Sequence, residues 1–163
     1  MKIISITGEQ NSGKTTFCND LKDWIVLQGA SQISYISPTG GVGPLTAYND
    51  SMGMGDHDFR AVYQVDLKES NSSKIIGICS SGDNHWITEN GFDDMINNIN
   101  NIDYLFLTSR IGGEHKFWHN RIEPKSIYKD HYLKFYTNRL DRQLISLSKK
   151  RSNFFDYIFK TVF

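Results

Sequence analysis

Four residues near the amino terminus have the types and the spacing that phosphate binding requires. Gly8, Gly13, Lys14 and Thr15 satisfy the pattern GxxxxGK[ST] within the stretch KIISITGEQNSGKTTFCNDL. Glycine lets a loop wrap with its amides directed inward, so that successive N–H groups form a nest for phosphate oxygens. A lysine ammonium can reach the outer phosphates, and a threonine hydroxyl can take one position on Mg²⁺. The stretch therefore predicts a site for a polyphosphate anion and its metal.

The segments on either side of this loop are the ones that such a site needs. Residues 1–7 form an isoleucine-rich run, which is typical of a strand buried on both faces of a parallel sheet. Residues 13–28 place apolar side chains at spacings of three and four, which predicts a helix ended by Gly29. The positive end of that helix would face the loop and attract an anion. A glycine turn that only joins a strand to a helix would leave Lys14 and Thr15 unexplained.

With this context on both sides, the chain resembles the P-loop NTPase superfamily, whose Walker A motif is the pattern described above. The resemblance implies Mg²⁺ as metal and ATP or GTP as ligand, with Lys14 as a catalytic residue and Thr15 as a metal ligand. The cofactor-binding set that it implies is Gly8, Glu9, Gln10, Asn11, Ser12, Gly13, Lys14, Thr15 and Thr16. The resemblance rests on specific motif residues in the loop and its flanking elements. Beyond them it rests only on the predicted order of strands and helices.

The superfamily adds an acidic residue at the end of a second core strand, and two aspartates compete for this role. Asp66 follows a β-rich run, but if residues 61–79 form a hairpin it lies at the wrong end of the sheet. Asp83 comes just past the end of a strand expected to be parallel to the first, where ligands gather in open α/β sheets. We therefore assign a catalytic and metal-binding role to Asp83, with Ser80 and Ser81 as supporting polar groups. The structural alternative is a turn with an Asx-type cap.

Along the rest of the chain, β-rich runs alternate with helical patterns, which favours an α/β sheet. Further strands are predicted at residues 32–37, 61–67, 74–79, 102–108 and 153–163, and further helices at 90–100 and 126–150. For residues 153–163 periodicity leaves a helix open as the alternative. We expect one domain, residues 1–163, with the P-loop NTPase-like three-layer α/β/α fold, a mostly parallel central sheet and a β-hairpin insertion.

Within the superfamily, the nearest comparison is with small nucleoside and nucleotide kinases. Those proteins carry a basic lid after the fourth core strand and end in a strand that resembles FDYIF, which this chain has at residues 155–159. The lid would be residues 110–125, with Arg110, Lys116 and Arg121 as its cations. A guanidinium binds phosphoryl oxygens in bidentate fashion, and Arg110 is the preferred catalytic cation because it lies closest to a strand end.

The glycine-rich segment of residues 38–60 would occupy the region where such kinases seat the phosphoryl acceptor. Its chemistry-bearing residues are Asp56, His57, Asp58 and Arg60, which could contact a sugar or a phosphate. The same composition also suits a loop without a ligand.

Two further patterns resemble known binding motifs. Residues 138–141, Asn-Arg-Leu-Asp, approximate the guanine-reading NKxD motif, but they fall inside the predicted helix 126–150 and we treat the match as coincidence. His115 and His119 are four residues apart, as zinc ligands can be, but no HExxH pattern or third ligand accompanies them. Surface histidines are the preferred interpretation.

The composition restricts the cell compartment and the kinds of partner that we expect. Lys plus Arg and Asp plus Glu number 18 each, so no net charge favours nucleic acid or an anionic membrane. No apolar stretch is long enough to span a bilayer or to serve as a signal segment, and the two cysteines match no metal or redox spacing. We expect a cytoplasmic protein whose partners are a nucleoside triphosphate, a small-molecule phosphoryl acceptor, and a protein partner or a second copy.

The preferred function is Mg²⁺-dependent binding of a nucleoside triphosphate, with ATP favoured, followed by phosphoryl transfer or hydrolysis. The alternative is a nucleotide-gated binding module with slow or no turnover, in which the ligand orders residues 38–60 for a protein partner, or a GTPase-like switch. The sequence leaves open the base, the acceptor, the pathway and the oligomeric state.

Overall fold

The computed structural model describes residues 1–36, 42–43, 59–67, 72–82, 84–137, 153 and 155. Its strands are β1 (Lys2–Gly8), β2 (Ser31–Ile36), β3 (Val42–Gly43), β4 (Arg60–Leu67), β5 (Ser72–Cys79), β6 (Tyr104–Arg110) and β7 (Tyr132–Thr137). Its helices are α1 (Lys14–Leu27), α3 (His85–Asn98), α4 (Ile111–Phe117), the π-helix η1 (Trp118–Ile122) and α5 (Ser126–Lys129). Asn153 and Phe155 are also helical.

The strands form one mixed sheet in the order β3-β2-β4-β5-β6-β1-β7. Strands β5, β6, β1 and β7 make a contiguous parallel block, with β1 between β6 and β7. The pairings β4–β5, β2–β4 and β2–β3 are antiparallel. The expected hairpin is therefore present as β4 and β5, but it belongs to the main sheet, and its reversal of chain direction makes the sheet mixed instead of mostly parallel.

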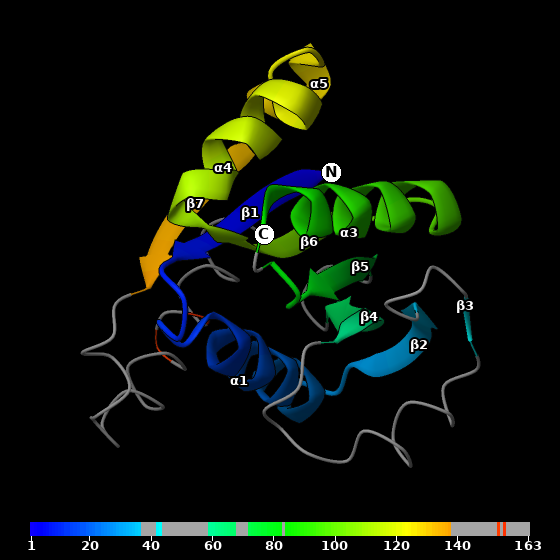
Figure 1. The fold of residues 1–163 in the computed structure, drawn as a ribbon. Coiled ribbons are helices and arrows are strands. Elements are labelled where there is room, and N and C mark those ends of the chain that lie inside the picture. Colours follow the sequence, from blue (N-terminus) through cyan, green and yellow to red (C-terminus); the bar gives the residue numbers. More distant parts are fainter. Residues whose placement is uncertain are drawn as a thin grey trace.

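Helices cover both faces of the sheet, which gives three layers (Figure 1). Strand β1 alternates between them: Ile4 and Ile6 pack in the core beneath α1, whereas Ile3 packs in the core beneath α3 and α4. Both cores are built mainly from buried aliphatic and aromatic side chains. Because β1 is buried on both faces, the loop that follows it starts from a fixed position.

The long helix predicted for residues 126–150 is wrong over the part that the structure describes. Only the short α5 forms, and residues 132–137 are the strand β7, which pairs in parallel with β1. Leucines spaced three and four apart produced the helical prediction. Tyr132, Lys134 and Tyr136 also recur at every second position, a spacing that suits a strand. Pairing with β1 favours this strand over the helix. Residues 138–150 lie outside the described residues.

The predicted last strand is also wrong at the two positions described, since Asn153 and Phe155 are helical. Phe155 is buried, and its ring lies edge-on to Phe17 of α1 at 5.2 Å between centroids. The contact with α1 buries this aromatic side chain without requiring a place in the sheet. The expected kinase-like carboxy-terminal strand is therefore absent at residue 155, and the last strand among the described residues is β7.

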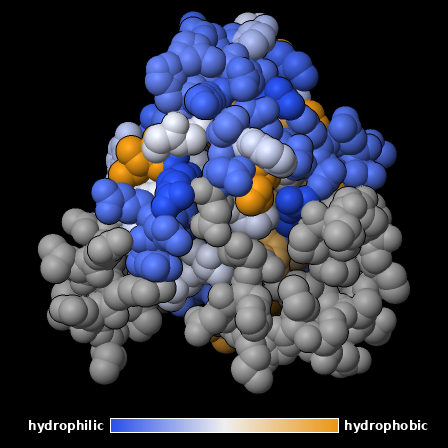
Figure 2. Space-filling view, in the orientation of Figure 1, coloured by the Kyte–Doolittle hydropathy of each residue, from blue (hydrophilic) through white to orange (hydrophobic). Residues whose placement is uncertain are grey.

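The described surface is mainly hydrophilic in the view of Figure 2, with isolated apolar patches. The exposed large apolar side chains come from several elements, among them Leu27 of α1, Trp86 of α3 and Ile127 of α5. None of the described helices combines the length and the apolar character needed to cross a membrane.

Candidate phosphate-binding site

The loop between β1 and α1 is folded back on itself. Ser12 donates its main-chain N–H to the carbonyl of Glu9 at 3.2 Å. Asn11 has a φ of 59° and Gly13 a φ of 90°, so two residues lie in the left-handed region within three positions. Asparagine tolerates that region and glycine adopts it without a steric penalty. The loop thus curls tightly at the point where the helix starts, as a nest of amides requires.

The side chain of Lys14 folds back onto this loop. Its ammonium donates hydrogen bonds to the carbonyl oxygens of Glu9 at 2.8 Å and Gly8 at 3.3 Å. The residue is only 6% exposed. The positive charge is therefore held against the loop's main chain, where an anion in the nest would meet it.

The amino terminus of α1 has neither a side-chain cap nor an acidic residue in its first turn. Gly13 occupies the N-cap position and offers no side chain. In helices generally, the first-turn N–H groups lie ahead of the first intrahelical carbonyl acceptors, and they commonly receive an oxygen from a capping side chain or a ligand. Thr15 and Thr16 follow in this turn and are both half-buried. The helix end is thus suited to an anion.

Two neighbouring strands place side chains beside the loop. In the sheet register Gly8 lies opposite Arg110 of β6 on one side and Thr137 of β7 on the other. The Arg110 guanidinium donates to Oε1 of Gln10 at 2.7 Å, and the hydroxyls of Ser12 and Thr137 lie 2.8 Å apart. The structure therefore brings Arg110 to the exposed side of the loop and fixes Ser12 on the other.

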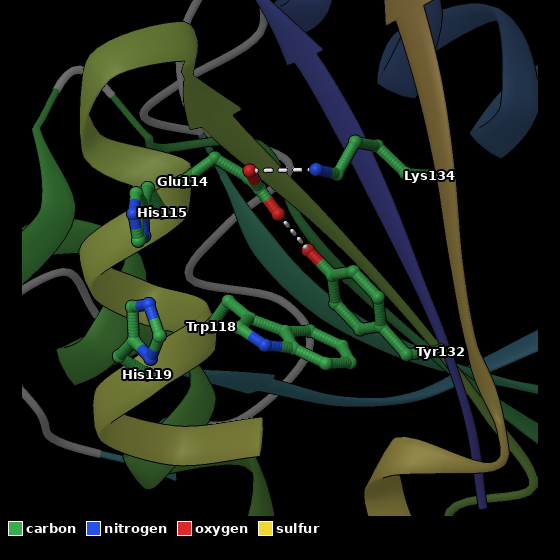
Figure 3. A pocket seen from close by; sticks show the side chains of 6 residues that line it. All are labelled: Glu114, His115, Trp118, His119, Tyr132 and Lys134. Carbon is green, nitrogen blue, oxygen red and sulfur yellow. Dashed lines mark hydrogen bonds and ion pairs between the residues drawn. The ribbon is translucent and has the colours of Figure 1, made fainter. Parts of the chain in front are cut away.

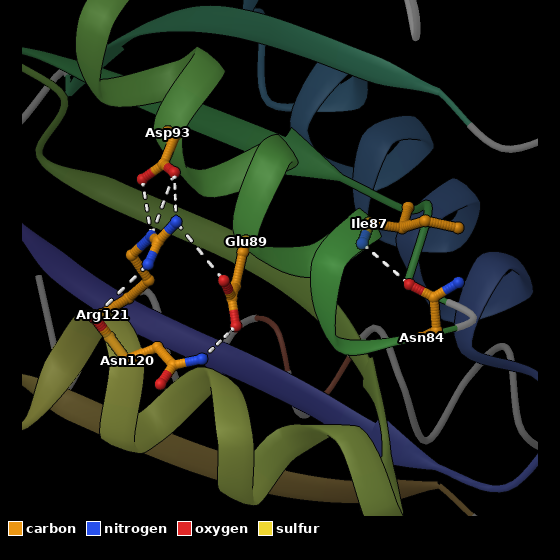
Figure 4. A network of polar contacts seen from close by, with 6 residues as sticks. All are labelled: Asn84, Ile87, Glu89, Asp93, Asn120 and Arg121. Atoms are coloured by element: carbon orange, nitrogen blue, oxygen red, sulfur yellow. Dashed lines mark hydrogen bonds and ion pairs between the residues drawn. The ribbon is translucent and has the colours of Figure 1, made fainter.

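Asp83 lies outside the described residues, but the chain on both sides of it is described. Gly82 packs so closely on β6 that an added Cβ would lie 2.0 Å from the carbonyl oxygen of Thr108. Asn84 caps α3 by accepting a hydrogen bond from the N–H of Ile87 at 3.0 Å (Figure 4). The segment thus leaves the carboxyl end of β5, which β6 separates from β1.

The two serines expected to support Asp83 are engaged elsewhere. Ser80 Oγ accepts from the N–H of Phe59 at 2.6 Å and donates to its carbonyl at 3.2 Å. Ser81 Oγ accepts from Nε of Arg60 at 3.4 Å. Both hydroxyls therefore tie the end of β5 to the start of β4. The competing Asp66 lies at the opposite end of this hairpin, where it pairs in register with Ser73.

The expected basic lid, residues 110–125, is instead mostly helical and packed on the sheet. Phe117 of α4 and Ile122 of η1 are fully buried. Gly113 allows α4 to approach α3, because a Cβ there would lie 2.9 Å from the main-chain nitrogen of His85. The segment alternates buried apolar anchors with its cations, which suits a docked helix better than a lid.

Arg121 is one of these cations, and its guanidinium is paired with carboxylates of α3 (Figure 4). Its guanidinium donates to both carboxylate oxygens of Asp93 at 2.8–3.0 Å and lies 3.3 Å from Glu89, both on α3. The hydrogen bonds to Asp93 raise the pKa of Arg121, while desolvation lowers it less. Among the three lid cations, Arg110 alone lies beside the loop; Lys116 is exposed on α4.

The structure describes one of the four residues proposed to contact a phosphoryl acceptor. Asp56, His57 and Asp58 lie outside the described residues. Arg60 is 3% exposed and forms an ion pair with Asp94 of α3, so its guanidinium serves the fold instead of a ligand.

A polar cluster that the sequence analysis did not identify lies under α4. Glu114 of α4 accepts hydrogen bonds from the phenol of Tyr132 at 3.0 Å and from Nζ of Lys134 at 2.8 Å, both on β7 (Figure 3). Deeper in the sheet, the hydroxyls of Ser5, Thr7 and Ser109 contact one another at 2.9–3.1 Å. The sequence signal for this cluster was the alternation of Tyr132 and Lys134, which suits one face of a strand. The helical prediction for residues 126–150 did not take it into account.

The rings of His115 and His119 lie 4.3 Å apart between centroids and are tilted by 39° to each other, and His119 pairs with Glu123. Within the described part of the chain, no group of three or more His, Cys, Asp or Glu side chains is placed to hold a metal ion.

Comparisons with family models, with curated proteins and with solved structures find no match to this chain.

Proposed function

We propose that the loop formed by residues 8–15 binds the phosphates of a nucleoside triphosphate, together with Mg²⁺, and that the protein transfers or hydrolyses the terminal phosphoryl group. The observation that carries the proposal is the position of Lys14, whose buried ammonium is held in the curl of the loop by the carbonyls of Gly8 and Glu9. A cation in that place offsets the charge of a polyphosphate that the loop amides surround.

The start of α1 supports the same ligand. Because Gly13 provides no capping oxygen and the first turn holds no carboxylate, the helix end has a positive electrostatic character. Thr15 in that turn would hold Mg²⁺ through its hydroxyl. Asp83 is proposed as the second metal group, acting through water, since its segment leaves β5 two strand spacings, about 10 Å, from β1.

Arg110 is proposed to stabilise charge on the transferred phosphoryl group. It lies opposite Gly8 in the sheet and is held by the exposed side chain of Gln10, an interaction that an anionic ligand can replace. Phosphoryl transfer requires little covalent chemistry from the protein, and one correctly placed arginine can raise the rate by roughly 10³ to 10⁵.

Equilibrium binding of ATP and of GTP to the purified chain, with and without Mg²⁺, tests the proposal. Lys14→Ala is expected to lower nucleotide affinity by about ten- to a hundredfold, because a charge-assisted contact is lost. Lys22→Ala is the matched control, since Lys22 lies on the same helix but contacts Asn19 and Asp23. Thr15→Val should reduce the gain in affinity that Mg²⁺ brings.

Equal nucleotide affinity in the parent chain and in Lys14→Ala, with both folded by circular dichroism, would reject the site. Multiple-turnover phosphate release, with and without nucleoside and nucleoside monophosphate acceptors, then separates the enzyme from a binding module. Tight binding without turnover would reject the catalytic half of the proposal and retain the binding half.

A further inference from the structure

A cavity lies between α4, η1 and β7, away from the loop that binds phosphate in our proposal. Its volume is about 590 Å³, and its lining side chains are Glu114, His115, Trp118, His119, Tyr132 and Lys134 (Figure 3). Small-molecule sites commonly have volumes of roughly 300–1,000 Å³, with aromatic walls and a few convergent polar groups. The cavity has both features.

The aromatic wall comes mainly from one helical face. His115, Trp118 and His119 are spaced at i, i+3 and i+4, so their side chains point to the same side. The rings of Trp118 and Tyr132 meet edge to face at 4.8 Å between centroids. The π-helix η1 begins at Trp118, and π-helical turns occur frequently at functional sites. The wall therefore offers ring faces and ring edges to a ligand.

The polar floor carries a matched pair of charges. The Glu114 side chain is 8% exposed and is bound by the Lys134 ammonium and the Tyr132 phenol. Burial raises the pKa of Tyr132, and the neighbouring charge of Glu114 adds to this, so the phenol keeps its proton at neutral pH. Desolvation lowers the pKa of Lys134, but Glu114 outweighs it and the pKa lies above its ordinary value. The floor thus presents donors and acceptors without a net charge.

We propose that this cavity binds a neutral planar heteroaromatic ring, of the kind found in nucleobases and nucleosides. Stacking on the histidine and tryptophan rings suits any base, because every base has a π-face. Base edges present both donors and acceptors, which the carboxylate, the ammonium and the phenol can complement. A polyphosphate does not fit, because the Glu114 carboxylate neutralises the Lys134 ammonium and would repel a second anion.

The cavity is separate from the loop at residues 8–15. Lys134 pairs in register with Ser5, three residues before Gly8, a distance of about 10 Å along a strand. The cavity also lies on the face covered by α4, whereas α1 covers the opposite face (Figure 1). A ring bound here is therefore not the phosphoryl acceptor of the proposed reaction but a ligand of its own site.

Histidine side-chain NMR tests the proposal on the full chain, which contains five histidines. Titration with adenosine, and separately with adenine, is expected to shift the His115 and His119 ring signals saturably and to leave His131, which is exposed outside the cavity, unchanged. The same shifts are expected in Lys14→Ala, because the loop is not involved. Ribose and inorganic phosphate should produce none.

Calorimetric titration with adenosine compares the parent chain with matched variants. The double variant His115→Ala/His119→Ala should weaken binding by about three- to tenfold, the size of lost ring stacking, and His131→Ala should leave it unchanged. Both altered histidines are exposed, so the fold is expected to survive. The proposal is overturned if adenosine and adenine leave the two rings unshifted, if phosphate or ribose shifts them equally, or if Lys14→Ala abolishes the shifts.

Discussion

Arg110 lies directly opposite Gly8 in the pairing of β6 with β1, and its guanidinium donates a 2.7 Å hydrogen bond to Gln10 in the loop that follows Gly8. The two residues are far apart in the chain, so only the sheet brings the cation to the loop. The Gln10 carboxamide is exposed and neutral, and a phosphate oxygen would be a stronger partner for the guanidinium.

Arg110→Ala is therefore expected to reduce turnover of nucleoside triphosphate by roughly 10³-fold or more while leaving nucleotide affinity nearly unchanged, because the guanidinium would act on charge that develops during transfer. Steady-state phosphate release with ATP and Mg²⁺ measures the effect. Lys116→Ala is the control, since Lys116 is exposed on α4. Unchanged turnover in Arg110→Ala would remove this residue from the catalytic assignment.

Gly8→Ala is expected to destabilise the protein by about 1–3 kcal/mol, the usual cost of overpacking. The added Cβ would lie 2.2 Å from Oγ of Ser12 and 2.3 Å from Oγ1 of Thr137, so the loop must shift away from β7. Gly112→Ala is the matched control: its Cβ meets no heavy atom within 4 Å, and alanine in a helix stabilises by roughly 0.5–1 kcal/mol over glycine. Urea unfolding of both variants measures the change in the free energy of unfolding. A neutral Gly8→Ala would contradict the tight loop packing.

Arg121→Ala is expected to lower the free energy of unfolding by about 1 kcal/mol, because partly exposed ion pairs and hydrogen bonds to Asp93 and Glu89 are lost. Nucleotide affinity should not change, since the guanidinium is turned toward α3. Unfolding and binding are measured on the same preparation, with Lys125→Ala as the control. A loss of nucleotide affinity without a loss of stability would restore the lid interpretation.

Stability is expected to fall as pH rises above about 9. Burial raises the pKa of the Cys79 thiol above its ordinary 9.0 and that of the Tyr132 phenol above its ordinary 10.0. The unfolded chain therefore releases these protons at lower pH than the folded chain, and the free energy of unfolding decreases through that range. Lys134 acts in the same direction, because its raised pKa keeps the stabilising proton only until the pH passes through the folded value.

Urea unfolding at a series of pH values from 7 upward measures this slope. Tyr132→Phe is expected to flatten it, because the phenylalanine ring has no proton to release. Tyr136→Phe, an exposed position on the same strand, is the control. Stability that stays constant or rises over this range would contradict the burial of these groups.

Local sequence was sufficient for β1, the loop and α1. In this segment a continuous apolar run, a glycine-containing turn and a period near 3.6 follow one another, and the observed bounds agree closely with the predicted ones. The helix at residues 90–100 was also predicted, although α3 begins earlier, at His85. The cap formed by Asn84 sets that start, and its signal is a single polar residue.

The sequence by itself thus determined the parts whose structure depends on near neighbours: the buried first strand, the curled loop with Lys14, the following helix and the β4–β5 hairpin. Only the tertiary structure decided that residues 132–137 form a strand on β1, that Arg121 is committed to α3, and that Glu114 meets Tyr132 and Lys134. The physical reason is that a short amphipathic segment suits a helix or a strand about equally. The choice depends on which partner completes its hydrogen bonds and buries its apolar face, and that partner is distant in the chain.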